Sequence, residues 1–202
     1  MSSDDGVAGG VSVGHDGVAR CPWAARDPLL VAYHDDEWGR PVRDERGLYE
    51  RVMLEGVQAG LSWRTILAKR PAFRAAFADF DPEAVAAFTD ERLEALMEDP
   101  GIVRNRAKIA AARTNAAAVI ALRDEGGLEQ LIWSHSPEPI EPRSITEVPT
   151  SSAESAALAK SLKRAGIRFI GPTSAFALME AIGMVNTHLV GCHRRGVSAA
   201  SG

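Results

Sequence analysis

The two cysteines of this 202-residue chain each have a histidine nearby, and the two pairs lie at opposite ends of the sequence. Cys21 precedes His34 by thirteen residues, and His188 precedes Cys192 by four. Two thiolates and two imidazoles make a closed tetrahedral set of the kind that holds structural zinc, with no position left for a catalytic water. If one ion binds all four, the fold must join the two ends across about 150 intervening residues.

The residues alone leave alternatives to this metal site. The cysteines can be two unrelated buried residues, and the histidines can be ordinary ones. His193, next to Cys192, is a rival ligand, whereas His15 and His135 lie in segments predicted to be a leader and a loop. Two cysteines are too few for a disulfide-stabilised scaffold. The spacing therefore favours a metal site and leaves its exact ligand set open.

Helical patterning dominates the rest of the chain. There are 33 alanines, few runs of β-branched residues and repeated 3.6-residue periodicity, which predict an all-α domain over residues 20–195. We expect a disordered, glycine-rich leader over 1–19 and a flexible tail over 196–202. No stretch approaches 18 apolar residues, and the leader has no apolar run, so neither a membrane span nor a signal peptide is predicted. We therefore expect a cytoplasmic protein. From its size we also expect a monomer.

Capping signals place several element boundaries. Asp81-Pro82 predicts a helix start, and Ser151 with Glu154 predicts a capping box for a helix that stops near Gly166. The remaining predictions are a helix over 104–122 with Ile109, Ala112, Ala116 and Val119 facing inward, a helix capped by Thr173 and running to about Gly183, a loop over 134–149, and a strand over 167–170.

One acidic residue falls on an apolar helix face. In the helix predicted over 47–59, Glu55 lies in the same angular band as Leu48, Val52 and Ala59. Burying a carboxylate is costly unless it is hydrogen-bonded or functional. The alternative is a glutamate at the edge of this face that reaches water or caps a backbone amide.

Aromatic residues gather around this helix in the sequence. Trp23, Tyr33 and Trp38 precede it, and Trp63 follows a turn in which Gly60 breaks the helix and Ser62 can cap the next one. A metal at Cys21 and His34 would also fix Trp23 and Tyr33. Aromatic faces around one buried carboxylate suit a flat, cationic, hydrogen-bonding ligand such as a methylated purine.

A tight turn followed by a basic helix indicates contact with nucleic acid. Pro100-Gly101-Ile102 separates two predicted helices, and the exposed amides at the start of the second helix suit a DNA phosphate. The net charge of −4 argues mildly against a nucleic-acid partner. However, residues 100–123 and 155–179 contain several basic residues and no acidic ones, so a basic face can form locally. The basic residues just after the turn are Arg104 and Arg106.

Six segments together resemble the 3-methyladenine DNA glycosylase I family, and the resemblance spans residues 20–194. They are 20–23, 32–39, 54–63, 101–104, 149–151 and 185–192. The resemblance implies a helix-hairpin-helix DNA glycosylase fold, with Cys21, His34, His188 and Cys192 as ligands of a structural zinc that joins the two ends. It also implies Glu55 as the catalytic pocket carboxylate and Trp23, Tyr33 and Trp63 as base-binding aromatics. Leu30 departs from some members, which have a tyrosine there, and Val103 stands where most such hairpins have a second glycine.

The activity implied by this resemblance is excision of 3-methyladenine from double-stranded DNA. The enzyme would flip the damaged nucleotide, with Leu61 filling the vacated stack, and release the free base. Gly101, Ile102, Arg104 and Arg106 would contact the DNA backbone. Asn105 stands where bifunctional relatives carry a Schiff-base lysine, so a monofunctional enzyme is expected. Asp124 and Glu125, near the position of the aspartate used by other glycosylases, are not assigned as catalysts.

Two other functions are compatible with the same motifs, as is a helical scaffold in which the cysteine–histidine spacing is coincidental. A non-catalytic DNA-binding module would keep the hairpin and the metal but has no need of Glu55. A zinc hydrolase would need an open metal position and a nearby carboxylate, for which Asp35 and Glu37 are candidates. Release of free methylated base separates the first from a glycosylase, and activity that survives chelation without loss of fold argues against the second.

Overall fold

Helices form nearly all the regular structure of the computed structural model, which describes residues 10–58 and 60–196. The prediction of a mainly helical chain is confirmed. The α-helices are α1 Pro28–Asp36, α2 Glu45–Val57, α3 Trp63–Ala76, α4 Pro82–Ala86, α5 Asp90–Leu96, α6 Arg106–Ala121, α7 Gly127–Trp133, α8 Ala153–Arg164 and α9 Pro172–Ala181. Short 3₁₀ turns lie at Pro22–Ala24, Ala78–Phe80, Leu122–Glu125 and Ile145–Glu147. None of the helices in these described ranges has the length and apolarity to cross a bilayer.

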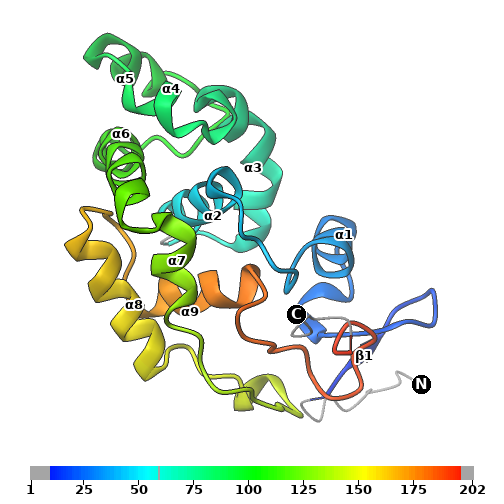
Figure 1. Ribbon diagram of the computed structural model, residues 1–202. Helices are drawn as coiled ribbons and strands as arrows, with labels where there is room; N and C mark the ends of the chain where they lie inside the picture. Colours follow the sequence, from blue (N-terminus) through cyan, green and yellow to red (C-terminus); the bar gives the residue numbers. More distant parts are fainter. Residues whose placement is uncertain (1–9, 59, 197–202) are drawn as a thin grey trace.

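Helix α2 lies at the centre of the molecule and is covered on all sides. It contacts α3, α6, α7 and α9, and every residue from Leu48 to Val57 is buried. Figure 1 shows α2 enclosed between α6 and α9, with α4 and α5 forming the far end of the molecule. The N-terminal strands and the last described residues lie together at the opposite end, beside α1. The fold therefore brings the two ends of the described chain to one region.

Side-chain caps explain most helix starts. Asp81 caps α4 with Pro82 at its first turn, as predicted, and Ser62 caps α3 by accepting the Thr65 amide. Helix α6 begins at Arg106, two residues later than expected, because the Asn105 side chain accepts the Lys108 amide and serves as its cap. The four inward-facing residues predicted for this helix are buried.

Two predicted helix starts are wrong by a small margin. The capping box of α8 is formed by Ser152 and Ser155, one residue along from the predicted pair, because Ser155 returns a hydrogen bond to the Ser152 amide. Helix α9 begins at Pro172 after Gly171, so Thr173 lies inside it, and it ends at Ala181. The loop predicted over 134–149 is irregular apart from its short 3₁₀ turn.

The strand predicted over 167–170 does not form, because the peptide groups of this segment bond to a side chain of α6. The Arg168 amide donates to Asn115 Oδ1 at 2.8 Å, and the Arg168 carbonyl accepts from Asn115 Nδ2 at 3.3 Å. The strands of the described chain lie instead in the predicted leader. Ser12–Val13 (β1) pairs antiparallel with Ala19–Arg20 (β2).

The predicted disordered leader is therefore wrong for residues 10–19, which form this hairpin and its turn. Arg20 holds the hairpin to the domain by bonding both Asp16 and Asp35. The rest of the predicted leader, residues 1–9, and residues 197–202 of the predicted tail lie outside the described residues.

Candidate active site

The two cysteine–histidine pairs meet in one buried cluster. The candidate ligand atoms of Cys21, His34, His188 and Cys192 all lie within 4.8 Å of one another. Cys192 Sγ lies 3.5 Å from His34 Nε2 and 3.6 Å from His188 Nδ1, and Cys21 Sγ lies 3.9 Å from His188 Nδ1. Sulfur and nitrogen ligands around a tetrahedral zinc stand about 3.5 Å apart for the usual bond lengths. The cluster is therefore close in its dimensions to a site for one metal ion of this size.

A carboxylate outside the cluster orients one of its histidines. His34 Nδ1 lies 2.8 Å from Asp35 Oδ1, which leaves Nε2 facing the sulfur of Cys192. The same oxygen lies 2.9 Å from His193 Nε2. Such a carboxylate–histidine contact is typical of metal ligands. His193, the rival ligand of the sequence analysis, therefore lies on Asp35 and outside the four-residue cluster.

Aromatic rings connect this cluster to a cavity. The Trp38 ring lies 4.4 Å from the His188 ring and 4.9 Å from the Trp23 ring, measured between centroids. Tyr33 follows, with its ring 5.5 Å from that of Trp63. The candidate ligand cluster therefore packs directly against the aromatic residues that line one wall of the cavity.

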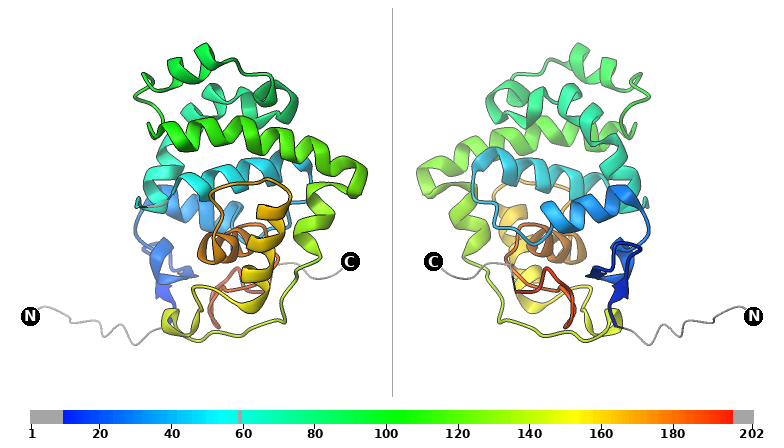
Figure 2. Two further views of the ribbon diagram at one scale, coloured as in Figure 1. Left: turned by 90° about the vertical axis from the view of Figure 1, so that its left-hand side faces the viewer. Right: turned by 90° about the vertical axis from the view of Figure 1, so that its right-hand side faces the viewer.

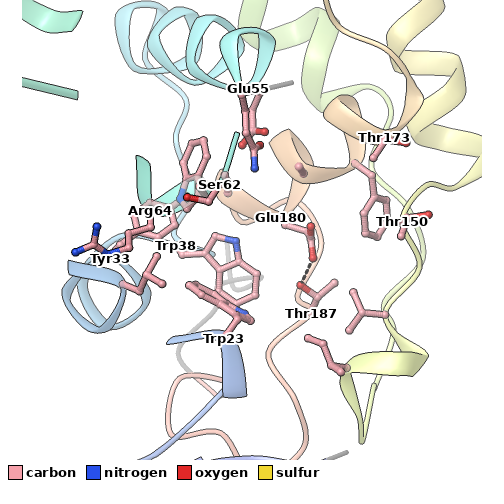
Figure 3. A pocket seen from close by; sticks show the side chains of 18 of the residues that line it. Trp23, Tyr33, Trp38, Glu55, Ser62, Arg64, Thr150, Thr173, Glu180 and Thr187 are labelled. Carbon is pink, nitrogen blue, oxygen red and sulfur yellow. Dashed lines mark hydrogen bonds between the residues drawn. The ribbon is translucent and has the colours of Figure 1, made fainter. Parts of the chain in front are cut away.

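The cavity has a volume of about 530 Å³, which is large enough for a nucleobase and part of its sugar. Figure 3 shows Glu55 from α2 and Glu180 from α9 directed toward the same hollow, with Trp23 and Trp38 along another side. The aromatic residues predicted for the site, Trp23, Tyr33 and Trp63, line it together. The structure thus brings together the predicted carboxylate and all three predicted aromatics.

Glu55 is buried without a full set of partners. Only 4% of it is exposed, and its Oε2 atom has no hydrogen-bond partner among the described residues. Burial, reinforced by the charge of Glu180 and opposed by Arg51, raises the pKa of Glu55 to about 8. The indole Nε1 of Trp63, which lines the same cavity, is likewise buried and unpartnered within the described chain. A buried acceptor and a buried donor on one cavity are suited to a hydrogen-bonding ligand.

A second acid, which the sequence analysis did not select, lines the same cavity. Thr187 Oγ1 donates to Glu180 Oε1 at 2.6 Å. Burial raises the pKa of Glu180 to about 7, although this hydrogen bond opposes the shift. Glu180 occurs in the apolar run Phe176–Ile182, and an acid within such a run was the signal available in the sequence.

The predicted DNA-binding residues lie in or beside two turns. Gly60 adopts a φ of +84°, and the Leu61 that follows is 40% exposed. In the turn before α6, Asp99 accepts the Gly101 amide at 2.7 Å, and a Cβ on Gly101 would lie 2.9 Å from Ala72 of α3. Ile102 is buried beneath this turn.

The two predicted arginines of this turn differ in their contacts. Arg104 is exposed, whereas Arg106 forms an ion pair with Glu94. Val103, where a glycine is more usual, does not have a positive φ, so its side chain is accommodated without strain. Arg106 is therefore partly neutralised by Glu94, whereas Arg104 is exposed.

Comparison with known proteins identifies the family. The sequence pattern of methyladenine glycosylases matches residues 23–195. The chain belongs to the methyladenine glycosylase family. Among members of this family, DNA-3-methyladenine glycosylase 1 of Escherichia coli K12 is 46% identical over 177 residues, which are 86% of this chain and 95% of that protein.

Solved structures of methyladenine glycosylases share the fold. The 3-methyladenine DNA glycosylase I of Staphylococcus aureus is 34% identical with a TM-score of 0.83, over 87% of this chain and 96% of that one. A single-residue variant of a 3-methyladenine DNA glycosylase I, solved in complex with 3-methyladenine, is 33% identical with the same TM-score, over 87% and 97% of the two chains. The likeness therefore covers nearly the whole of these relatives.

Proposed function

We propose that this protein is a monofunctional DNA glycosylase that excises 3-methyladenine from alkylated double-stranded DNA in base excision repair, acting as a cytoplasmic monomer. One observation carries the proposal: Glu55, buried and with an unpartnered oxygen, faces an aromatic-walled cavity in a chain of this family. Relatives of the chain are named for this activity, and one was solved with 3-methyladenine.

The cavity can select the damaged base by charge. Methylation at N3 makes the adenine of the nucleotide a cation, and the faces of Trp23, Tyr33 and Trp63 attract cations. Stacking on one such ring contributes about 1–3 kcal/mol per base. The Glu55 carboxyl accepts or donates at the edge of the base, and the arrival of a cation favours its ionised form. Neutral adenine gains neither the charge attraction nor this ionisation.

The substrate supplies much of the driving force for the bond cleavage. The C1′–N9 bond breaks with its electron pair going to the base, which leaves as neutral 3-methyladenine. Water then adds to C1′ and releases a proton. The residues of the cavity need to stabilise the departing base and the positive charge that develops on the sugar. A group already held in place, such as Glu55, can do this without having to reorient during the reaction.

The two surface turns are suited to hold flipped DNA. Leu61, exposed beside the cavity residue Ser62, would occupy the space that the flipped base leaves in the stack. The turn at Gly101 and Ile102 and the first amides of α6 would bind a phosphate as a helix-hairpin-helix element, with Arg104 beside them. Asn105 is the cap of α6 and offers no amine for a Schiff base, in keeping with a monofunctional enzyme.

A structural zinc held by Cys21, His34, His188 and Cys192 would fix the aromatic wall. The donor types and spacings fit zinc. Because Cys21 and His34 lie close to Trp23 and Tyr33 in the chain, the ion would hold these two aromatic rings near the C-terminal segment. Cys192→Ser should therefore lower the melting temperature and the zinc content together. His193→Asn is the matched control and should retain zinc. Full stability of a zinc-free Cys192→Ser protein would contradict the ligand assignment.

Chromatography of bases released from methylated duplex DNA tests the activity itself. The wild type should liberate free 3-methyladenine without cutting the strand. Glu55→Gln should reduce the rate by about 10²-fold or more, the effect expected for removing a preorganised polar group from a reacting site. The exposed Glu138→Gln is the control for the same chemical change. Equal rates for all three proteins would remove Glu55 from the mechanism, and the absence of released base from the wild type would refute the activity.

A further inference from the structure

The turn between α8 and α9, residues 166–171, presents an aromatic side chain to solvent. Phe169 is 47% exposed, whereas Ile167 and Ile170 on either side of the Arg168–Phe169 pair are buried. Phe73, Phe77, Phe80 and Phe176 are also buried. The two isoleucines anchor the turn, and the residues between them face outward.

The backbone at this aromatic residue is strained. Phe169 has a φ of +67°, in a region that bulky side chains rarely occupy. Such a conformation is energetically costly and persists only where the surroundings impose it. A glycine would adopt this φ without strain.

A buried side chain imposes this conformation. Asn115 of α6 is buried and bonds both the amide and the carbonyl of Arg168, the residue before the strained one. On the α8 side, the Ile167 amide donates to the Leu162 carbonyl at 2.9 Å and closes the end of the helix. The turn is therefore a rigid support for its two exposed side chains.

The turn lies next to the elements that shape the cavity. A Cβ on Gly56, the residue after Glu55, would lie 3.6–3.7 Å from the Phe169 carbonyl oxygen and Cβ. Helix α9, whose Thr173 and Phe176 line the cavity, begins directly after the turn. In the left panel of Figure 2, the turn faces the viewer in front of α2, on the same side as α6 and the chain that leads into it.

The charge around the turn is suited to a polyanion. Lys163 and Arg168 are exposed on or beside it, and Lys108 of α6 donates to the Val57 carbonyl at the end of α2. Ion pairs occupy Arg70, Arg74 and Arg123 elsewhere, but within the described residues no ion pair engages Lys163 or Arg168. These two cations are therefore free to bind phosphates.

We propose that the Arg168–Phe169 turn is a second DNA-contact element, in which Phe169 packs against an exposed base or deoxyribose near the flipped nucleotide and Arg168 binds a phosphate. This inference rests on the proposed function. A duplex that is opened for base flipping exposes apolar base faces, which an aromatic ring can cover, and phosphates, which an unpaired guanidinium can bind. The strain at Phe169 is then offset when DNA is bound.

The decisive variant is Phe169→Gly, because stability and DNA affinity should respond in opposite directions. We expect a melting temperature equal to or above that of the wild type and an affinity at least 5-fold weaker for a duplex that contains a stable abasic-site analogue, measured by fluorescence anisotropy. The affinity for free 3-methyladenine should not change, because Phe169 does not line the cavity. Val13→Ala, which shortens an exposed apolar side chain on β1, is the control and should bind the duplex like the wild type.

Arg168→Gln tests the phosphate contact and leaves the backbone bonds of Asn115 intact. Its slope of log affinity against log salt should fall by about 1, as expected for one lost phosphate contact. Arg46→Gln, at the opposite end of α2, should keep the wild-type slope.

The outcomes separate this inference from the proposed function. A wild type that excises 3-methyladenine, together with wild-type duplex affinity for Phe169→Gly, would overturn the inference alone. So would a melting temperature well below that of the wild type, which would show a structural role, or a loss of self-association in this variant with unchanged DNA binding. A wild type that neither binds nor excises would refute the proposed function first.

Discussion

Two glutamates on one helix, Glu50 and Glu55 of α2, are almost equally buried but have opposite environments. Glu50 is 7% exposed and Glu55 is 4% exposed. Arg70 Nε donates to Glu50 Oε1 at 2.5 Å, and Arg74 bonds both of its oxygens. Burial raises the pKa of Glu50, but the hydrogen bonds from Arg74 and Arg70 outweigh it, so the pKa is lowered. Glu55 has no such cation on its free oxygen, and its pKa is raised to about 8.

The comparison shows that burial alone does not make an acid functional. Glu50 belongs to a network in which Arg70 also bonds Glu37, and Arg51 bonds Glu37 from the other side. This network fixes α1, α2 and α3 to one another. Glu55 faces a cavity, so its unmet hydrogen-bonding capacity is available to a ligand. A paired buried acid stabilises the fold, whereas an unpaired one on a cavity costs stability and is suited to binding.

The largest expected difference between the two glutamates is in how their substitution changes the free energy of unfolding. Glu50→Gln removes a buried charge from two arginines and should lower the free energy of unfolding by about 3 kcal/mol. Glu55→Gln should leave it unchanged or raise it, because a neutral amide is less costly to bury than a carboxylate. Urea unfolding at pH 7 measures both, and equal losses in the two variants would contradict the distinction.

The pH dependence should sharpen the same distinction. The lowered pKa of Glu50 contributes stability above its unfolded-state pKa that is lost as the pH falls. The pKa of Glu55 is raised from 4.5 to about 8, so it costs stability as the pH rises through that range. The free energy of unfolding of Glu55→Gln should therefore exceed that of the wild type by an amount that grows to roughly 1–3 kcal/mol near pH 8. Unfolding curves of both proteins between pH 5 and 9 test this, and a constant difference would count against it.

The smallest effect concerns the second acid of the cavity. Glu180→Gln removes a like charge that raises the pKa of Glu55, so the pKa of Glu55 should fall. NMR titration of the labelled Glu55 carboxyl detects this shift. Glu129→Gln, on the surface of α7, is the matched control, and an identical titration of Glu55 in the Glu180 variant would show that the two acids are not coupled.

Much of the site was accessible from the sequence because spacing and periodicity constrain local geometry. The cysteine–histidine spacings predicted the buried cluster that forms, and the turn at Gly60 with its Ser62 cap predicted where Trp63 begins α3. The apolar face of α2 predicted that Glu55 is buried, although the physical reason is broader. Glu50 and Arg51 are buried as well, since neighbours cover α2 on every side.

The features that were missed depend on contacts between distant segments. Glu180 and Thr187 enter the cavity through the packing of α9 and the chain after it, and the local sequence offered only the acid within the apolar run Phe176–Ile182 as a signal. Residues 167–170 have the composition of a strand, but Asn115, more than fifty residues away, takes their hydrogen bonds. The hairpin of residues 10–20 is held to the domain by the ion pair between Arg20 and Asp35 of α1.

The sequence by itself determined the helical class, the approximate positions of several helices, the four ligand candidates and the family. These properties follow from periodicity, capping and fixed spacing, which act over a few residues or are carried by the motifs. Only the tertiary structure decided which buried acid is paired and which faces the cavity, and which exposed aromatic residue is held under strain. Hydrogen bonds and desolvation depend on every neighbour of a side chain in space, and most of those neighbours are far away in the chain.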